Sequence, residues 1–460
     1  MRVSIVGTGY VGLVSGVCLA EAGHPVTCVD VDPRRVQSIN DGDTPFHEAG
    51  LRRLLRRNLS KRFTATDDLE RAVLRSDLTV IAVGTPSRGR RIDLGAVRAA
   101  ASQIGRALAA KKRYHVVVVK STVVPGTTDT VVLPLLEAAS GRRAGRDFGV
   151  GMNPEFLSEG QAVRDFMHPD RIVLGGIDAR TTAALDRLYR PFAGVPVLRT
   201  NPRTAEMIKY ASNALLATLI SFSNEIGDVC EATPGVDCED VMEGMHLSQY
   251  LTSKVGRRRV LAPISAFLRP GCGFGGSCLP KDVNALVGYG SAAGCRTGLL
   301  REVMAINARR AERMLSLLRR HFDDFHGLPV AVLGLAFKPG TDDLRESPAI
   351  PIVASLVDQG AQVRVFDPVA MPAARRAGLF DGASFADTMA GAVETAKAVV
   401  LVTAWPEFRA LERLSAPRRR SLVIVDGRRV LDRHRFGRYE GIGLGAPEGG
   451  RLRDGEVDDE

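Results

Sequence analysis

Residues 2–12 read RVSIVGTGYVG, and this stretch decides the fold at the start of the chain. The apolar run at 2–6 predicts a β-strand, and GTGYVG has the GxGxxG spacing of a turn from a strand into a helix. Small and apolar residues at 13–22 predict that helix, and PVTCVDV at 25–31 predicts a second strand. The chain therefore opens with a βαβ unit.

The same alternation continues along the chain. Strand-like runs at 78–83, 115–119 and 147–151 are separated by helical segments, which is typical of a mostly parallel sheet. The segment 203–231 has helical apolar spacing without proline and predicts one long helix, and a second strand–turn–helix–strand unit begins with PVAVLGL at 329–335. We therefore predict the α/β class, with two Rossmann-like doubly wound domains joined by a central helical domain that contains a long helix.

Composition excludes several classes of protein. The 460 residues exceed the length of one typical domain, and a hydrophobic content of 45% is ordinary for a globular protein. The formal net charge is +10, but the basic residues are dispersed and few aromatic residues could stack on bases, so we expect no nucleic-acid partner. No apolar run approaches the ~20 residues of a membrane helix, and the first residues leave no room for a signal peptide. We expect no membrane association and a cytoplasmic location.

The cysteines argue against covalent or metal cross-links. There are seven, an odd number, and no CxxC pair occurs. A disulfide framework or a structural zinc site is therefore not expected, and we predict no metal.

The glycine turn predicts a dinucleotide site. Gly7 allows the tight turn, Gly9 lets backbone approach a pyrophosphate, and Gly12 lets helix and strand pack closely. Asp30 ends the next strand, 18 residues after Gly12, where it would accept hydrogen bonds from the adenosine ribose and disfavour the phosphate of NADP. We predict NAD as the cofactor. Arg34 and Arg35 lie close by and leave NADP open as an alternative.

The second strand–turn unit, VAVLGLAFKPGTDDLRESP at 330–348, lacks GxGxxG. It should not bind a second dinucleotide in the same way. Lys338 and Arg345 flank its turn, where they could hold phosphate charge; the alternative is that they are surface charges near a loop.

A second glycine-rich stretch, GCGFGGSCLPKD at 271–282, surrounds Cys278. Glycine lets a ligand come close to backbone, so this thiol would be reachable, and a cation such as Lys281 would lower the pKa of a neighbouring thiol. The alternative is a cysteine buried in a loop.

These segments together resemble the UDP-glucose/GDP-mannose dehydrogenase family. The resemblance covers nearly the whole chain, and its motifs occur in family order. They are GTGYVG at 7–12, VGTP at 83–86, STVVPGT at 121–127, NPEFLSEG at 153–160, EMIKYASNA at 206–214, GFGGSCLPKD at 273–282, FKPGTDDLRESP at 337–348 and DGRR at 426–429.

The resemblance implies a four-electron oxidation. Enzymes of this family oxidise the C6 hydroxymethyl of a nucleotide sugar to a carboxylate with two NAD. A thiolate adds to the aldehyde formed first, and the adduct can donate a second hydride and leave a thioester for hydrolysis. The resemblance therefore assigns the nucleophile to Cys278.

It also assigns roles to other residues of this sequence. Lys209 and Asn213, four apart on one predicted helix face, match the pair that stabilises an oxyanion, and Asp282 matches the acid that handles protons through water. Thr122 and Glu155 match positions that order the hydrolytic water. The other expected cofactor contacts are Tyr10, Val11, Arg35, Gly84, Thr85, Thr122, Glu159, Lys281 and Arg345. The expected substrate contacts are Glu155, Phe156, Leu157, Lys209, Asn213, Phe274, Gly275, Lys338 and Arg428.

The predicted domains follow from the motifs. We place an NAD-binding Rossmann-like domain at 1–200, a central helical dimerisation and catalytic-loop domain at 201–322, and a nucleotide-sugar-binding Rossmann-like domain at 323–446. The polar tail at 447–460 is expected to be disordered. The family packs the long central helix against a second subunit, so we expect a homodimer or a larger homo-oligomer.

Three points stay open at this level. The sequence favours UDP-glucose as the substrate, with GDP-mannose and a UDP-N-acetylhexosamine as alternatives, and an NAD-dependent binding or regulatory protein on the same fold as the non-enzymatic reading. A basic insertion around SKVGRRR at 253–259 falls in a region that in the family often lends an arginine to the neighbouring subunit. The candidates for that role are Arg257, Arg258, Arg259 and Arg269.

Overall fold

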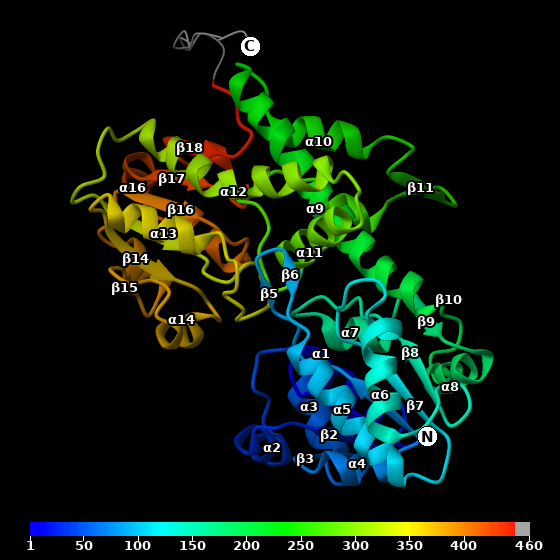
Figure 1. Cartoon of the computed structure of the whole chain (residues 1–460). Helices are drawn as coiled ribbons and strands as arrows, with labels where there is room; N and C mark the ends of the chain where they lie inside the picture. The colour runs from blue at the N-terminus through cyan, green and yellow to red at the C-terminus, as the bar shows by residue number, and fades with distance from the viewer. Residues whose placement is uncertain (447–460) are drawn as a thin grey trace. The chain divides into compact units, whose positions relative to one another are not determined.

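The computed structural model describes residues 1–446, which form two compact units (Figure 1). The first unit contains Met1–Asn213 and Lys281–Arg296, and the second contains Ala214–Pro280 and the described residues from Thr297. The tail at 447–460, which the sequence predicts to be disordered, lies outside the described residues. Each unit is built around its own sheet.

The first unit contains an eight-stranded sheet in the order β10-β9-β8-β7-β4-β1-β2-β3. All its neighbouring strands are parallel except β8 and β9, which pair antiparallel. The central strands are largely apolar and fully buried because helices cover both faces of such a sheet. The strands are β1 (Val3–Val6), β2 (Val26–Val29), β3 (Phe63–Thr66), β4 (Leu78–Ile81), β7 (His115–Val119), β8 (Phe148–Met152), β9 (Ile172–Gly176) and β10 (Val197–Thr200).

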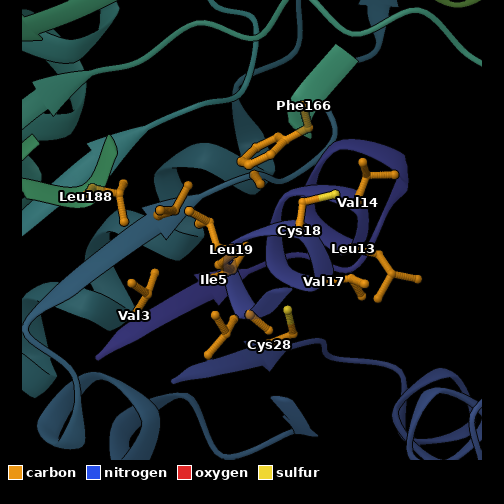
Figure 2. Close-up of a cluster of buried hydrophobic side chains, with 14 of the residues drawn as sticks. Val3, Ile5, Leu13, Val14, Val17, Cys18, Leu19, Cys28, Phe166 and Leu188 are labelled. Carbon is orange, nitrogen blue, oxygen red and sulfur yellow. The ribbon is translucent and has the colours of Figure 1, made fainter. Parts of the chain in front are cut away.

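Helix α1 (Tyr10–Glu21) packs closely on this sheet. A Cβ at Gly16 would meet Cys28 Sγ at 2.5 Å, so glycine is needed where the helix crosses β2. Figure 2 shows Cys18 and Leu19 of α1 in the core with Ile5 of β1 and Phe166. The other helices of this part of the chain are α2 (Pro33–Asn40), α3 (Leu51–Asn58), α4 (Leu69–Arg75), α5 (Gly95–Ala110), the π-helix η1 (Thr128–Val132), α6 (Leu133–Ser140), α7 (Ala162–Met167) and α8 (Ala179–Tyr189).

The long helix α9 spans Pro202–Ala232, close to the predicted 203–231. Its first part, to Asn213, belongs to the first unit, and the remainder to the second. Two further helices follow the glycine-rich loop: α11 (Leu279–Ala292) and α12 (Gly298–Arg319).

The basic insertion interrupts the helices of the central part of the chain. After α10 (Cys238–His246) the chain forms an antiparallel hairpin of β11 (Thr252–Val255) and β12 (Arg258–Leu261), followed by the short helix η2 (Pro263–Phe267). Gly256, with φ of +60°, makes the turn between the two strands. Strand β12 is exposed along its whole length.

The second unit contains a six-stranded sheet in the order β15-β14-β13-β16-β17-β18, with every pairing parallel. The strands are β13 (Pro329–Leu333), β14 (Gln362–Phe366), β15 (Ser384–Phe385), β16 (Ala398–Leu401), β17 (Val423–Asp426) and β18 (Arg438–Gly441). The helices are α13 (Ala349–Asp358), α14 (Met371–Ala377), α15 (Met389–Val393), η3 (Pro406–Arg413), α16 (Ala416–Ser421) and η4 (Arg433–Arg435).

The predicted fold class is confirmed: the first unit holds a mostly parallel sheet and the second a parallel sheet, and a long helix lies between the two sheets in the sequence. Short strands β5 (Ser87–Arg88) and β6 (Arg91–Ile92) form a separate hairpin after the VGTP segment. Within residues 1–446, every helix is too short or too polar to span a lipid bilayer.

Candidate active site

The GxGxxG turn has the geometry that a dinucleotide requires. Gly7 adopts φ of +101°, and a Cβ at Gly12 would lie 2.0 Å from the Gly7 carbonyl oxygen. A Cβ at Gly9 would meet no described atom within 4 Å, so this side of the turn is open. Gly9 is also the N-cap of α1, and no side chain of the described residues caps that helix. The first amides of α1 are thus available to a pyrophosphate, and the turn fits NAD.

Asp30 stands immediately after β2 and is buried. Its Oδ2 accepts hydrogen bonds from Thr8 N at 2.9 Å and from Thr8 Oγ1 at 2.5 Å, and Arg35 Nη1 lies 3.4 Å from the same oxygen. Burial acts to raise the pKa of Asp30, but the Thr8 hydrogen bonds, the Asp32 amide and the Arg35 charge hold it below its ordinary value. The residue is therefore a fixed anion at the position expected for ribose recognition.

Other predicted cofactor residues are linked to this turn. Tyr10 donates from its hydroxyl to Glu48, and the Gly160 amide donates to the same Glu48 oxygen at 2.7 Å. Glu159, beside Gly160, is half-buried, as are Tyr10 and Val11. Thr85 Oγ1 donates to the Thr122 carbonyl at 2.9 Å, and Gly84 is exposed. Glu48 thus links the glycine turn to the NPEFLSEG segment, and Thr85 links the VGTP segment to the STVVPGT segment.

The predicted catalytic side chains of the first unit form two buried pairs. Lys209 Nζ lies 2.9 Å from Glu155 Oε1, and both side chains are about 95% buried, with relative exposures of 4% and 5%. Asn213 Nδ2 donates to Asp282 Oδ2 at 2.6 Å. Lys281 Nζ lies 2.5 Å from the other oxygen of Asp282. Lys209 and Asn213, one turn apart on α9, therefore each hold a carboxylate.

Glu155 is kept ionised by its surroundings. Burial acts to raise its pKa, but the charge and hydrogen bond of Lys209, the Leu157 amide and the charge of Lys120 hold the pKa below its ordinary value. Phe156, next in sequence, contacts Arg171 through its ring, with 3.9 Å from the guanidinium carbon to the ring centre, and Lys209 Nζ is 5.7 Å from the same ring. The NPEF segment thus places one carboxylate and one aromatic ring beside the Lys209 ammonium.

In the second unit, side chains of α9 and α12 bind the backbone of the loop that leads to Cys278. Asn307 of α12 accepts from Phe274 N at 2.8 Å and donates to Phe274 O at 2.9 Å. Asn224 of α9 accepts from Gly271 N at 2.7 Å, and Arg310 donates to Gly271 O at 3.1 Å. These contacts fix the start of the loop before the chain reaches the thiol.

The glycines of this loop are required by close approach. A Cβ at Gly275 would lie 2.1 Å from the Glu346 carbonyl oxygen, and one at Gly276 would lie 2.7 Å from the Phe337 ring. The Gly276 amide donates to the Arg345 carbonyl at 2.8 Å. The loop therefore packs against the FKPGTDDLRESP segment. These two motifs lie more than 60 positions apart in the sequence.

The cysteines of this loop differ in accessibility. Cys278 is half-buried, and its Sγ lies 3.6 Å from Ser277 Oγ. Cys272 is buried, with Sγ 3.4 Å from the Gly427 carbonyl, and burial raises the pKa of its thiol. All seven cysteines lie in the described residues, and five of them are buried; Cys278 is half-buried and Cys295 is exposed.

In the second unit, three residues that are predicted to contact a ligand have side chains that contact other groups of the protein. The Arg345 guanidinium donates to both oxygens of Asp343, and Lys338 Nζ lies 5.6 Å from the centre of the Phe337 ring. Arg428 donates to the Gly273 carbonyl at 3.0 Å and to the Val402 carbonyl at 2.8 Å. Arg428 thus binds the backbone of the loop that leads to Cys278. The side chain of Phe274 is buried.

Sequence reasoning missed residues that support the site. Lys120 lies directly after β7 and is 5% exposed, and Asn153 lies directly after β8 and is 3% exposed. Their positions in the sequence could have indicated both residues. In α/β proteins, site residues lie at the carboxyl ends of the parallel strands, and each of these polar residues directly follows a buried strand. Asn224, Asn307 and Arg310 gave no such signal, because nothing in a helical pattern marks a polar residue that will face a loop.

The open glycine turn, the fixed Asp30 and the buried lysine–carboxylate pair define an NAD-binding oxidoreductase. The chain matches three family models: the NAD-binding domain of the UDP-glucose/GDP-mannose dehydrogenase family at residues 1–193, its central domain at 203–309 and its UDP-binding domain at 331–433. The chain belongs to this family, and its first domain binds NAD.

Relatives within the family carry more than one substrate name. UDP-glucose 6-dehydrogenase AglM of Haloferax volcanii is 44% identical over 96% of this chain and 100% of its own length. GDP-mannose 6-dehydrogenase of Pseudomonas aeruginosa is 41% identical over 80% of this chain and 81% of its own. The solved structure of a UDP-glucose dehydrogenase from Pyrobaculum islandicum is 38% identical, with a TM-score of 0.88 over 96% of this chain and 98% of its own.

Proposed function

We propose that this chain oxidises the C6 hydroxymethyl of UDP-glucose to the carboxylate of UDP-glucuronate, with Cys278 as the covalent nucleophile. The observation that carries the proposal is the pair of buried contacts, Lys209 with Glu155 and Asn213 with Asp282. Burying charged groups costs stability even when they are paired. Such clusters are therefore expected where charge is used, in catalysis.

The first half of the reaction makes an aldehyde. NAD, when bound, would supply the hydride acceptor for both oxidations. In the first, Asp282 receives the hydroxyl proton through water, while Lys209 and Asn213 stabilise the developing negative charge on the C6 oxygen. The Cys278 thiolate then adds to the aldehyde carbon, a C–S bond forms, and the carbonyl oxygen takes a proton to give a thiohemiacetal.

The second half consumes water. The thiohemiacetal loses its hydroxyl proton and its hydride and becomes a thioester on Cys278. A water ordered by Thr122 and Glu155 adds to the thioester carbon, the C–S bond breaks, and the sulfur leaves as a thiolate that can be protonated. One sugar alcohol, two NAD and one water thus yield one carboxylate, two NADH and three protons.

UDP-glucose is the proposed substrate because the C-terminal part of the chain matches a UDP-binding domain and AglM, with which the identity is 44%, is a UDP-glucose 6-dehydrogenase. GDP-mannose is the second candidate, favoured by the 41% identity to GDP-mannose 6-dehydrogenase. Oxidation of a UDP-N-acetylhexosamine is a third. The non-enzymatic alternative, a binding or regulatory protein, would not need Lys209, Asn213, Cys278 and Asp282 together.

A panel of nucleotide sugars tests the proposal. UDP-glucose, GDP-mannose and UDP-N-acetylglucosamine are each incubated with NAD, and NADH absorbance is compared with the sugar consumed. We expect two NADH per UDP-glucose and a higher kcat/KM for UDP-glucose than for the other two. A faster reaction with GDP-mannose would reassign the substrate, and one NADH per sugar would contradict the covalent route.

The remaining sequence predictions form part of this proposal. We propose domain boundaries at residues 200 and 322, and the cofactor and substrate contacts that the sequence predicts. We also propose that the protein forms a homodimer or a larger homo-oligomer. We also propose a cytoplasmic location, because a reducing compartment keeps a catalytic thiol reduced.

A further inference from the structure

Lys120 is a buried lysine beside the proposed hydrolytic residues, with no role in the reaction as described so far. Its Nζ donates to Asn153 Oδ1 at 2.9 Å and lies 3.4 Å from the Tyr189 hydroxyl of α8. Tyr189 donates to the same Asn153 oxygen at 2.5 Å, and Asn153 Nδ2 donates to the Val173 carbonyl at 2.9 Å. Both hydrogen-bond partners of the ammonium are therefore neutral groups.

The position of this contact connects two strand ends. Strands β7 and β8 pair in parallel, with Val119 opposite Met152. Lys120 follows β7 and is two residues before Thr122, and Asn153 follows β8 and is two residues before Glu155. The Lys120–Asn153 hydrogen bond thus joins the two segments that carry the proposed hydrolytic residues.

The charge of Lys120 also acts on the site. The charged groups that face it are Glu155, after β8, and Lys209, on α9; Tyr189 of α8 contacts it, and the Phe166 ring of α7 lies 5.8 Å from its Nζ. Burial lowers the pKa of Lys120 to about 8, with Glu155 opposing and Lys209 adding to that shift. A second cation near Glu155 favours the ionised carboxylate.

We propose that Lys120 is a positioning residue for thioester hydrolysis, which holds the Thr122 and Glu155 segments together through Asn153 and supplies positive charge that keeps Glu155 a carboxylate. This inference rests on the proposed function. It adds no chemical step: the water still adds to the thioester carbon and the sulfur still leaves, but the acceptor for the water depends on Lys120.

The chain offers a matched control in Lys111. This lysine is also in the first unit and is 6% exposed, and burial likewise lowers its pKa to about 8. Its Nζ donates to the carbonyls of Val73, Leu74 and Ser76, at the end of α4, and to none of the proposed site residues. A methionine at 111 or 120 removes a buried ammonium from the same domain, but only one of the two faces Glu155.

The test compares Lys120→Met with Lys111→Met in the full-length protein. Both variants are expected to lose stability in urea unfolding, since each leaves buried oxygens without a donor. Only Lys120→Met should slow turnover of UDP-glucose about tenfold, which corresponds to about 1.4 kcal/mol of barrier. In acid-quenched samples, intact mass should reveal sugar bound to Cys278 in Lys120→Met and at most the wild-type amount in Lys111→Met.

The pH profile gives a readout that a purely structural role would not move. Without the Lys120 charge the pKa of Glu155 rises, so the acid limb of the kcat profile should move to higher pH in Lys120→Met. Lys120→Arg keeps the charge and should return the limb toward the wild-type position. If Lys120→Met does not fold, Asn153→Asp is used instead, because a carboxylate there neutralises Lys120 and should move the limb in the same direction.

Two failures are distinguishable. Equal losses of turnover in the two methionine variants, with unchanged acid limbs and no added adduct, would overturn the role of Lys120 while wild type still forms two NADH per sugar. If wild type itself forms one NADH per sugar, or none, the proposed function fails first.

Discussion

Asn213 and Asp282 are 69 positions apart in sequence and share a 2.6 Å hydrogen bond between buried side chains. The contact joins α9 to α11 within the first unit. Asp282 also accepts from Lys281, so its two oxygens are held from two directions. These two contacts fix the orientation of the Asp282 carboxylate.

The thiol of Cys278 is expected to be indispensable. In Cys278→Ser the fold and NAD binding should persist, but serine is rarely ionised near neutral pH, so turnover should fall by about a thousandfold or more. NADH formation from UDP-glucose measures this. Cys295→Ser is the control because Cys295 is exposed and outside the loop; loss of activity in that variant alone would mean that the wrong cysteine has been assigned.

The Lys209–Glu155 pair should make stability depend on pH. The folded-state pKa of Glu155 is below its unfolded value, so the pair contributes stability above pH ~4.3, and that contribution is lost as pH falls through the folded pKa. Glu155→Gln leaves Lys209 without its carboxylate and should cost about 3–5 kcal/mol at pH 7. Urea unfolding at pH 7 and pH 4 should show a smaller difference between variant and wild type at pH 4.

An equal difference at both pH values would contradict the assignment of this pH dependence to Glu155. Glu137→Gln serves as a reference, because Glu137 is a partly exposed carboxylate paired at 3.6 Å with an exposed arginine and should contribute little.

Asp30 should determine cofactor choice. Its carboxylate accepts hydrogen bonds from Thr8 and Arg35, and its charge opposes a 2′-phosphate. Asp30→Ser removes that charge and leaves Arg35 available to a phosphate, so the ratio of kcat/KM for NADP to that for NAD should rise about tenfold or more. Arg35→Ala in the same background should reverse the gain. An unchanged ratio in Asp30→Ser would show that selectivity resides elsewhere.

The outer face of α9 should mediate self-association. Leu215, Phe222 and Val229 repeat every seven residues and are 50%, 41% and 59% exposed, so they lie along one side of the helix. We expect a dimer or larger species by light scattering at micromolar concentration, and a smaller mass for Phe222→Asp. Leu299→Asp, at an exposed apolar position of α12, is the control. A monomeric wild-type protein would exclude this assembly.

The fold was largely predictable because its signals are local. Buried parallel strands such as β7 appear as short apolar runs, and the glycine turn and α9 have distinctive spacing. The edge strands β10 and β3 were not predicted, since they carry exposed and polar residues that resemble loops. The hairpin at 252–261 was also missed because three adjacent arginines obscure any alternation of apolar and polar residues.

The candidate site was predictable only in part. Family motifs pointed to Lys209, Asn213 and Asp282, but not to the pairing of Lys209 with Glu155, which depends on how α9 meets the end of β8. Lys120 resembles an ordinary charge at a strand end until its burial is known. Such contacts arise from tertiary packing between segments that no sequence period connects.

The β11–β12 hairpin has a practical consequence for handling the protein. Strand β12 is exposed throughout. Arg257 lies in the turn of the hairpin, and Arg258 and Arg259 are the first two residues of β12. A two-stranded hairpin is only marginally stable by itself, so this segment should open often enough to enter a protease active site. Brief trypsin digestion should nick the chain here first and leave two large fragments that stay associated under native conditions.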